Sequence, residues 1–432
     1  MLQAVFNAFK IPDLRRKIIF TLVMLLIFRF VAHIPVPGVD RQALDNLLNQ
    51  NQLLGMLNLF SGSALRQFSI AAMGVYPYIT ASIIMQLLQP IIPRLEELSK
   101  EGEQGRNTIN RYTHWLTVPL ALLQAFGQCQ LMKSQGILKD FGLFDGATAL
   151  RSVSILLSMM AGSIFLVWIG ELITENGVGQ GVSIIIFGGI VANLPDAVGK
   201  LSSGTSTGQS IMGVLVFLLL GLITIVGIVL INEGQRRIQV NYARRVRGNR
   251  MYGGQSTHIP LKVNSAGMIP LIFAVSIMVF PGYIANLFTA SDRAWLRGPA
   301  SFLARVFDAN SFQYQVIYFL MVVAFTYFYT MVIFQQQNIA ENLQKNGGFI
   351  PGIRPGAPTS TFLTKVLTRI TLVGALFLGL VAVLPWILAR LTGVQTLFLS
   401  STSLLIVVGV AIDTMRQLEA QLLMRHYEGF IR

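Results

Sequence analysis

Long apolar stretches separated by polar links dominate this chain, and ten of them are long enough, or nearly so, to cross a membrane as helices. A membrane-spanning helix needs about 20 mostly apolar residues, because each residue advances it by about 1.5 Å. We therefore expect an all-α integral membrane fold with ten transmembrane helices. They are placed at residues 18–34, 75–92, 113–132, 152–172, 181–199, 211–232, 266–288, 314–335, 368–389 and 396–415.

The composition agrees with this pattern. Of the 432 residues, 53% are hydrophobic and only 12% are charged, whereas about 25% of the residues of a typical soluble domain are charged. The first 20 residues are amphipathic and basic, and no small-residue cleavage site follows the next apolar run. We expect this segment to be retained rather than removed as a signal peptide.

The basic residues set the orientation. Most of the 33 Lys and Arg residues fall on one side of the ten-helix arrangement, together with both termini and two long links at about 232–265 and 336–367. Cytoplasmic loops carry an excess of Lys and Arg. Both termini and both long loops are therefore predicted to be cytoplasmic.

The ten spans divide into two halves of five, residues 1–199 and 200–432. An odd number of spans in each half makes the second half enter the membrane from the opposite side. If the halves share a fold, they form an inverted repeat, and such repeats place the functional path at their interface, near the membrane midplane.

The stretch from residue 60 to residue 90 is predicted to contain a break in the backbone. Its first part, about 61–72, is too short to cross a membrane and carries Arg66 and Gln67; its second part begins with Pro77 just after the flexible Gly74. Broken backbone at membrane depth needs protein or a water-filled cavity to satisfy its polar groups. Residues 61–72 therefore form either a re-entrant packing loop or a short re-entrant helix that plugs a pore, held there by weak contacts.

Several classes of function are disfavoured. The spans carry almost no charge near their centres, since Glu171 and Asp413 lie toward span ends, whereas ion-coupled transporters and proton pumps place ionisable groups there. One cysteine and four scattered histidines give no metal-ligand spacing. No phosphate-binding loop and no carboxylate pair within a span is present, so we predict neither an enzyme nor a cofactor. A facilitative small-solute transporter is the alternative function that these observations leave.

The long link at 236–262 is strongly basic. It carries seven Lys and Arg residues interleaved with Tyr242 and Tyr252. The charge is explained equally well by topology, which places basic loops in the cytoplasm, and by a docking surface for an acidic or RNA-containing partner.

Six motifs along the chain together resemble the SecY family, the channel subunits of bacterial Sec protein-translocation complexes. They are IPVPG (34–38), LFSGSALRQFSIAAMGVYPYITASIIMQLL (59–88), TENGVGQGVSIIIFGGIVANLP (174–195), INEGQRRIQVNYARR (231–245), QSTHIPLKVNSAGMIP (255–270) and GFIPGIRPG (348–356). The resemblance implies a channel that passes unfolded secretory polypeptides across the plasma membrane. It also implies a lateral gate, between spans 2 and 3 on one side and spans 7 and 8 on the other, that releases membrane segments into lipid.

The resemblance also implies three sets of site residues. The pore ring corresponds to Ile79, Ile83, Ile186, Ile190, Ile272 and Ile406. The plug corresponds to Ser61, Gly62, Ser63, Ala64, Leu65, Arg66, Gln67, Phe68, Ser69, Ile70, Ala71 and Ala72. Cytosolic partners are expected to dock on loops that carry Arg244, Arg245 and Arg354.

Partners and location follow from the same resemblance. We expect SecE-like and SecG-like small membrane subunits, a SecA-like ATPase motor, ribosomes, signal sequences, nascent polypeptides and membrane lipid. The expected location is the bacterial inner membrane.

An isoleucine ring suits a polypeptide channel physically. A path that accepts any side chain needs a narrow apolar waist without binding groups, and isoleucine is bulky, apolar and stiff. Ile79 and Ile83 are four residues apart, as are Ile186 and Ile190, so each pair shares one helix face.

Overall fold

The computed structural model describes residues 9, 11–37, 39, 44, 61–62, 64–134, 136–138, 141–142, 148–205, 211–242, 245–247, 250–252, 256–289, 294–308, 311–392 and 400–428. In chain order the elements are α2 (Pro12–Val31), the 3-10 helix η1 (Leu65–Gln67), α5 (Tyr76–Leu88), α6 (Pro93–Lys100), α7 (Glu103–Ser134), α8 (Ala149–Asn176), α9 (Gly181–Thr205), α10 (Ile211–Glu233), β1 (Gln235–Tyr242), β2 (Arg245–Arg247), β3 (Arg250–Tyr252), β4 (Ser256–Lys262), α11 (Ile269–Thr289), α12 (Ala294–Val306), α13 (Phe312–Gln337), α14 (Ile339–Lys345), β5 (Gly348–Phe349), α15 (Ala357–Thr392) and α16 (Ser400–Glu428).

Each of the ten apolar stretches overlaps a helix, namely α2, α5, α7, α8, α9, α10, α11, α13, α15 and α16. Within the described ranges, three helical segments are long and apolar enough to cross a membrane, Ala149–Asn176, Phe312–Lys345 and Ala357–Leu384. Four shorter apolar segments lie on α5, α9, α10 and α11. The structure therefore shows a mostly helical molecule with strongly apolar helices.

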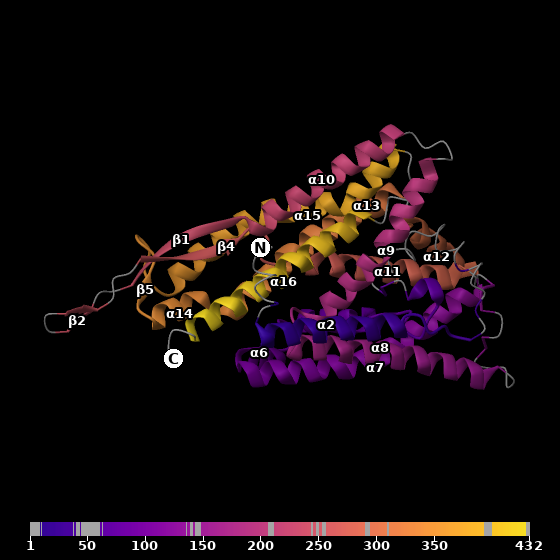
Figure 1. The fold of residues 1–432 in the computed structure, drawn as a ribbon, viewed down its shortest axis with the longest axis horizontal. Coiled ribbons are helices and arrows are strands. Elements are labelled where there is room, and N and C mark those ends of the chain that lie inside the picture. The colour runs from indigo at the N-terminus through magenta and orange to yellow at the C-terminus, as the bar shows by residue number, and fades with distance from the viewer. Residues whose placement is uncertain are drawn as a thin grey trace.

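The helices lie roughly along one direction in an elongated bundle (Figure 1). Helices that pack against each other in this bundle include α13 with α15, α5 with α7, α7 with α8, and α10 with α16. The β1–β4 hairpin, α6, α14 and the C-terminal end gather at one end of the bundle, and α12 lies at the other. The predicted basic loops thus share one end.

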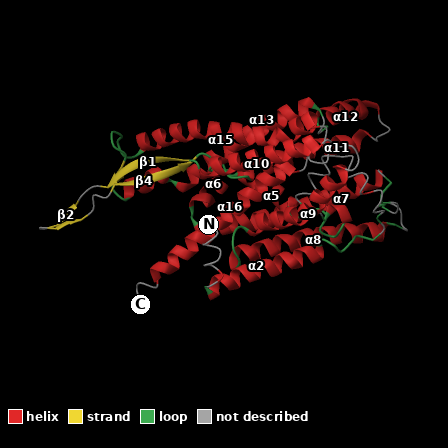
Figure 2. Ribbon diagram, turned by 45° about the horizontal axis from the view of Figure 1, so that its top comes forward, coloured by secondary structure: helices red, strands yellow, loops and turns green. Residues whose placement is uncertain are grey.

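The prediction of an all-α fold is too narrow for the long link at 232–265. Here β1 pairs with β4 in antiparallel register, with Ile238 opposite Ile259, and β5 adds a third strand beside β1. Figure 2 shows the strands projecting beyond the helices. Ile238 and Val240 are buried while Arg237 and Gln239 are exposed, and this alternation with a period of two is what strands require.

The hairpin packs onto the second long loop and the start of α15. Ile238, Val240 and Leu261 form one apolar cluster with Leu343 of α14 and Leu363 of α15. The two long loops therefore form a single folded unit at one end of the bundle.

Candidate functional site

The six isoleucines of the predicted ring come from four helices. Ile79 and Ile83 lie on α5, Ile186 and Ile190 on α9, Ile272 on α11 and Ile406 on α16. Every one is buried, with at most 8% of its surface exposed, and all six belong to one hydrophobic cluster. Residues far apart in the sequence, from both halves of the chain, are thus brought into one apolar region.

The predicted plug segment packs against this region. Ala64 and Ala71 belong to the same cluster as the six isoleucines, and Ile70 packs against it. Leu65 and Phe68 are fully buried in a neighbouring cluster with α7 and α8. Ser63 lies outside the described residues.

The predicted helix over 61–72 is wrong in extent. Its only helical part among the described residues is the three-residue η1, which ends at Phe68 with a left-handed φ of 42°. Small residues and a left-handed position favour turns over a continuous helix. The predicted break is found where expected: Gly74 has φ +57° and α5 begins at Tyr76, with Pro77 in its first turn.

The contacts of this segment are tight rather than weak. The Arg29 guanidinium donates to the Gly62 carbonyl at 3.1 Å. The Val36 amide donates to the Phe68 carbonyl at 2.9 Å, and the Ile70 amide donates to the Ile34 carbonyl at 3.1 Å. Backbone bonds therefore hold the segment to residues 34–36.

Two glycines on neighbouring helices make room for the segment. A Cβ on Gly189 of α9 would collide with the Cα of Gly62, and a Cβ on Gly162 of α8 would collide with the carbonyl of Ile70. Both helices thus approach the backbone of the segment directly. Gly189 also lies next to Ile190, so it joins the plug segment to a ring position.

The helices of the predicted lateral gate meet beside the ring. The Tyr76 hydroxyl, at the start of α5, donates to the Ser276 carbonyl of α11 at 3.0 Å. The two residues are 200 positions apart. This hydrogen bond joins the start of α5 to α11 along the line where the two helices meet, here called the seam.

The predicted docking residues fall on the unit formed by the two long loops. Arg354 is exposed beside β5, and its carbonyl accepts a hydrogen bond of 2.8 Å from the Thr359 hydroxyl at the start of α15. Arg245 begins β2, and Arg244 lies outside the described residues. Arg354 is therefore presented on a loop that the first turn of α15 holds in place.

Comparison with known proteins decides the family. The SecY family model matches residues 69–415. The chain belongs to the SecY family. The protein translocase subunit SecY of Halalkalibacterium halodurans is 45% identical over 441 residues, which cover all of both chains. The family prediction is confirmed.

Solved SecY and Sec61 channels share the fold. A structure from work on the SecY plug domain has a TM-score of 0.62 at 16% identity and covers 96% of each chain. Sec61 in the canine ribosome–channel complex has a TM-score of 0.56 at 16% identity, with the same coverage. The likeness covers nearly the whole of this chain.

Sequence reasoning missed Gly162, Gly189 and Tyr76. The close contacts of Gly189 could have been predicted from the sequence, because two adjacent glycines in FGGI stand directly before Ile190 on an apolar helix. Such a pair is typical of close helix packing in membranes. Gly162 had a similar signal, because it stands between Ala161 and Ser163 on an apolar helix. Tyr76 had none, since its partner comes from a distant segment.

Proposed function

We propose that this chain is the channel subunit of a bacterial protein translocase, passing unfolded polypeptides across the plasma membrane. One observation carries the proposal: six isoleucines from four helices share one buried apolar cluster with residues of the 61–72 segment. Membership in the SecY family supports the same function. A channel subunit driven by partners needs no catalytic residues, in keeping with a chain that is no enzyme.

In this proposal Ile79, Ile83, Ile186, Ile190, Ile272 and Ile406 form the constriction, and residues 61–72 form the plug. An apolar waist excludes water and slows ions without binding the passing chain. A facilitative small-solute transporter would need a polar binding site at the midplane, whereas the six residues that the two halves of the chain bring together here are all buried isoleucines. The channel is therefore the better account.

In this proposal the lateral gate opens between two pairs of helices, α5 and α7 on one side and α11 and α13 on the other. Opening this seam breaks the hydrogen bond from Tyr76 to Ser276 and exposes the ring region to lipid. Apolar signal sequences and membrane segments gain by leaving through it, because burying each CH₂ group in lipid contributes about 0.8 kcal/mol.

The topology is ten spans in two inverted halves, residues 1–199 and 200–432, with both termini in the cytoplasm. Gathering of the basic loops at one end of the bundle supports this orientation (Figure 1). The cytoplasmic unit of hairpin, α14 and Arg354 binds a SecA-like motor or a ribosome, in line with the canine Sec61 channel solved in a ribosome–channel complex. SecE-like and SecG-like subunits complete the channel in the membrane.

Reconstitution tests the function. The chain is placed in lipid vesicles with its small membrane subunits, and a secretory precursor, the motor and ATP are added. We expect the precursor to become protected from external protease only when all components are present. Protection that persists without the chain, or none with the complete set, would overturn the proposal.

A further inference from the structure

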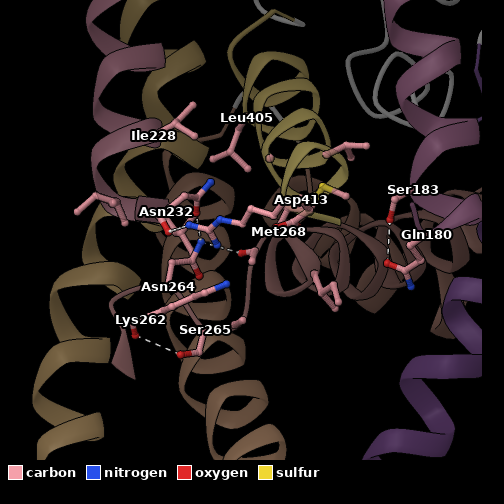
Figure 3. A pocket seen from close by; sticks show the side chains of 18 of the residues that line it. Gln180, Ser183, Ile228, Asn232, Lys262, Asn264, Ser265, Met268, Leu405 and Asp413 are labelled. Atoms are coloured by element: carbon pink, nitrogen blue, oxygen red, sulfur yellow. Dashed lines mark hydrogen bonds between the residues drawn. The ribbon is translucent and has the colours of Figure 1, made fainter. Parts of the chain in front are cut away.

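A cavity of about 340 Å³ lies at the root of the β1–β4 hairpin, where α9, α10, α11, α13, α15 and α16 converge. Figure 3 shows its polar side chains, with Asn232, Lys262, Asn264 and Asp413 turned toward one another. The hairpin leaves the bundle at this point. Besides the apolar contacts with α14 and α15, these residues are the connection between the hairpin and the helices α10, α11 and α16.

Direct bonds join the two ends of the hairpin to each other and to α10. The Val263 amide donates to the Gly234 carbonyl at 2.9 Å, just beyond the last β1–β4 pair. The Asn264 side-chain amide donates to the Asn232 side-chain carbonyl at 2.7 Å and to the Gly267 carbonyl at 3.1 Å. These contacts tie the end of β4 to the end of α10.

One arginine joins the same point to α16. The Arg416 guanidinium forms an ion pair of 2.7 Å with Glu233 and donates to the Asn232 carbonyl at 3.2 Å. Arg416 and Asn232 are 184 residues apart. A guanidinium can hold both oxygens in one geometry because its donors are fixed in a plane.

Two more charges complete the group. Lys262 lies within electrostatic range of Arg416, Asp413 and Glu233. Burial, and then the neighbouring Arg416 charge, lower the pKa of Lys262, while Asp413 and Glu233 act in the opposite direction. Two cations therefore face two carboxylates, so the group is neutral as a whole and suits a structural joint better than an ion-binding site.

Two of the helices that meet here, α11 and α16, each carry one of the six isoleucines and are bonded to the root of the hairpin. Ile272 lies in the first turn of α11, just after the loop that Asn264 holds. Ile406 lies ten residues before Arg416 on α16, about 15 Å along the helix axis at ~1.5 Å per residue. On the far side, Gly374 of α15 abuts the Val263 carbonyl, so that a Cβ there would lie 2.6 Å from it. The hydrogen bonds and ion pair around the cavity, together with this close approach, thus connect the root of the hairpin to α11, α15 and α16.

We propose that Asn232, Glu233, Lys262, Asn264, Asp413 and Arg416, here named the root joint, couple the hairpin mechanically to Ile272 and Ile406. A partner that tilts the hairpin then shifts α16 and the start of α11, and loosens the C-terminal half of the constriction. Packed elements transmit such shifts because they have discrete arrangements rather than bending continuously. The inference rests on the proposed channel function.

Variants of Arg416 and Glu233 test the coupling in the complete reconstituted complex. Arg416→Gln removes the ion pair and Arg416→Lys keeps the charge but not the planar double contact. Glu233→Gln and the double variant Glu233→Gln with Arg416→Gln complete a double-mutant cycle. The matched control is Glu171→Gln, which changes a 2.5 Å contact between Glu171 of α8 and His114 of α7, two side chains about as exposed as Glu233 and Arg416 but outside the cytoplasmic unit.

Three readouts separate coupling from binding and folding. They are co-purification of the small membrane subunits, the Kd of the motor, and the motor-stimulated rates of translocation and ion conductance. We expect Arg416→Gln to leave assembly and the motor's Kd unchanged and to lower both stimulated rates at least tenfold. The double variant should be no worse than the single one, because both remove the same contact. Glu171→Gln should match the wild type.

Stimulated rates at the control level in the Arg416 variants would overturn the coupling. So would a weakened motor Kd that accounts for the whole loss, since the root joint would then only shape the docking surface. If the Arg416→Gln complex fails to assemble, Arg416→Lys is used instead. Its stimulated rates should fall less than tenfold, but by more than those of the control variant. A wild-type complex without motor-stimulated translocation would refute the proposed function, and the coupling with it.

Discussion

Replacing Gly189 by alanine should unseat the plug segment and make the resting channel leak ions. Gly189 lies on α9 beside Ile190, and a Cβ there would collide with the Cα of Gly62. Backbone cannot rotate out of the way as a side chain does. Gly62 is itself pinned, since it has φ +63°, its carbonyl accepts from Arg29, and its own Cβ would lie 2.5 Å from the ring of Phe28.

The magnitude follows from overpacking. Forcing an extra methyl group into a well-packed site costs about 1–3 kcal/mol. The strain is relieved when the segment leaves, so the population of the displaced state should rise by about 5–150-fold, as a free-energy change of that size requires.

Gly188 provides the control. A Cβ on Gly188 would meet only the end of the Leu25 side chain, at 2.8 Å, and that end can rotate. Both substitutions stabilise α9 itself by about 1 kcal/mol in the open and closed states alike. Single-channel conductance in planar bilayers, without motor or precursor, is the assay. Equal resting conductance of Gly189→Ala and Gly188→Ala, with both complexes assembled, would refute the argument.

Three further changes test other parts of the account. Ile406→Asn should relax the need for a strongly hydrophobic signal sequence, because the closed state loses buried apolar surface worth about 1.5–3 kcal/mol. Leu14→Asn, at a similarly buried site in a cluster without plug or ring residues, should not, as export of signal-defective precursors would show. Arg354→Glu should abolish motor-driven translocation while leaving assembly intact, and unchanged rates in vesicles would contradict it. Deleting residues 61–72 should leave a folded channel with raised resting conductance, and an unaltered conductance would mean that the segment is no seal.

The positions of the helices could be predicted from the sequence because membrane helices depend on local composition. An apolar run of about 20 residues satisfies its own backbone and needs no partner to become a helix in lipid. The break before α5 was equally local, because Gly74 supplies a left-handed residue and Pro77 suits a first turn. Each of these features needs only its near neighbours in the chain.

The conformation of residues 61–72 could not be predicted, because distant residues set it. Gly162 and Gly189 admit its backbone, and residues 34–36 supply its hydrogen bonds. The pair of Arg416 with Glu233 is likewise invisible in a sequence read locally.

The β1–β4 hairpin, in contrast, could have been predicted from its local sequence but was not. Its pattern was present in RRIQVNY, where Ile238 and Val240 alternate with polar residues. The concentration of arginine there favoured an interpretation by charge alone. Alternation would have predicted a strand.

Cross-linking a halted polypeptide to the channel tests the central claim most directly. Single cysteines replace Ile79, Ile186, Ile272 or Ile406 in a chain whose native Cys129 is changed to alanine, and a precursor with one cysteine is halted midway. We predict disulfides from the precursor to all four positions, drawn from both halves, and none to a cysteine at the exposed Leu222 of α10. Cross-links at Leu222 but not at the four isoleucine positions would contradict a polypeptide path through the ring.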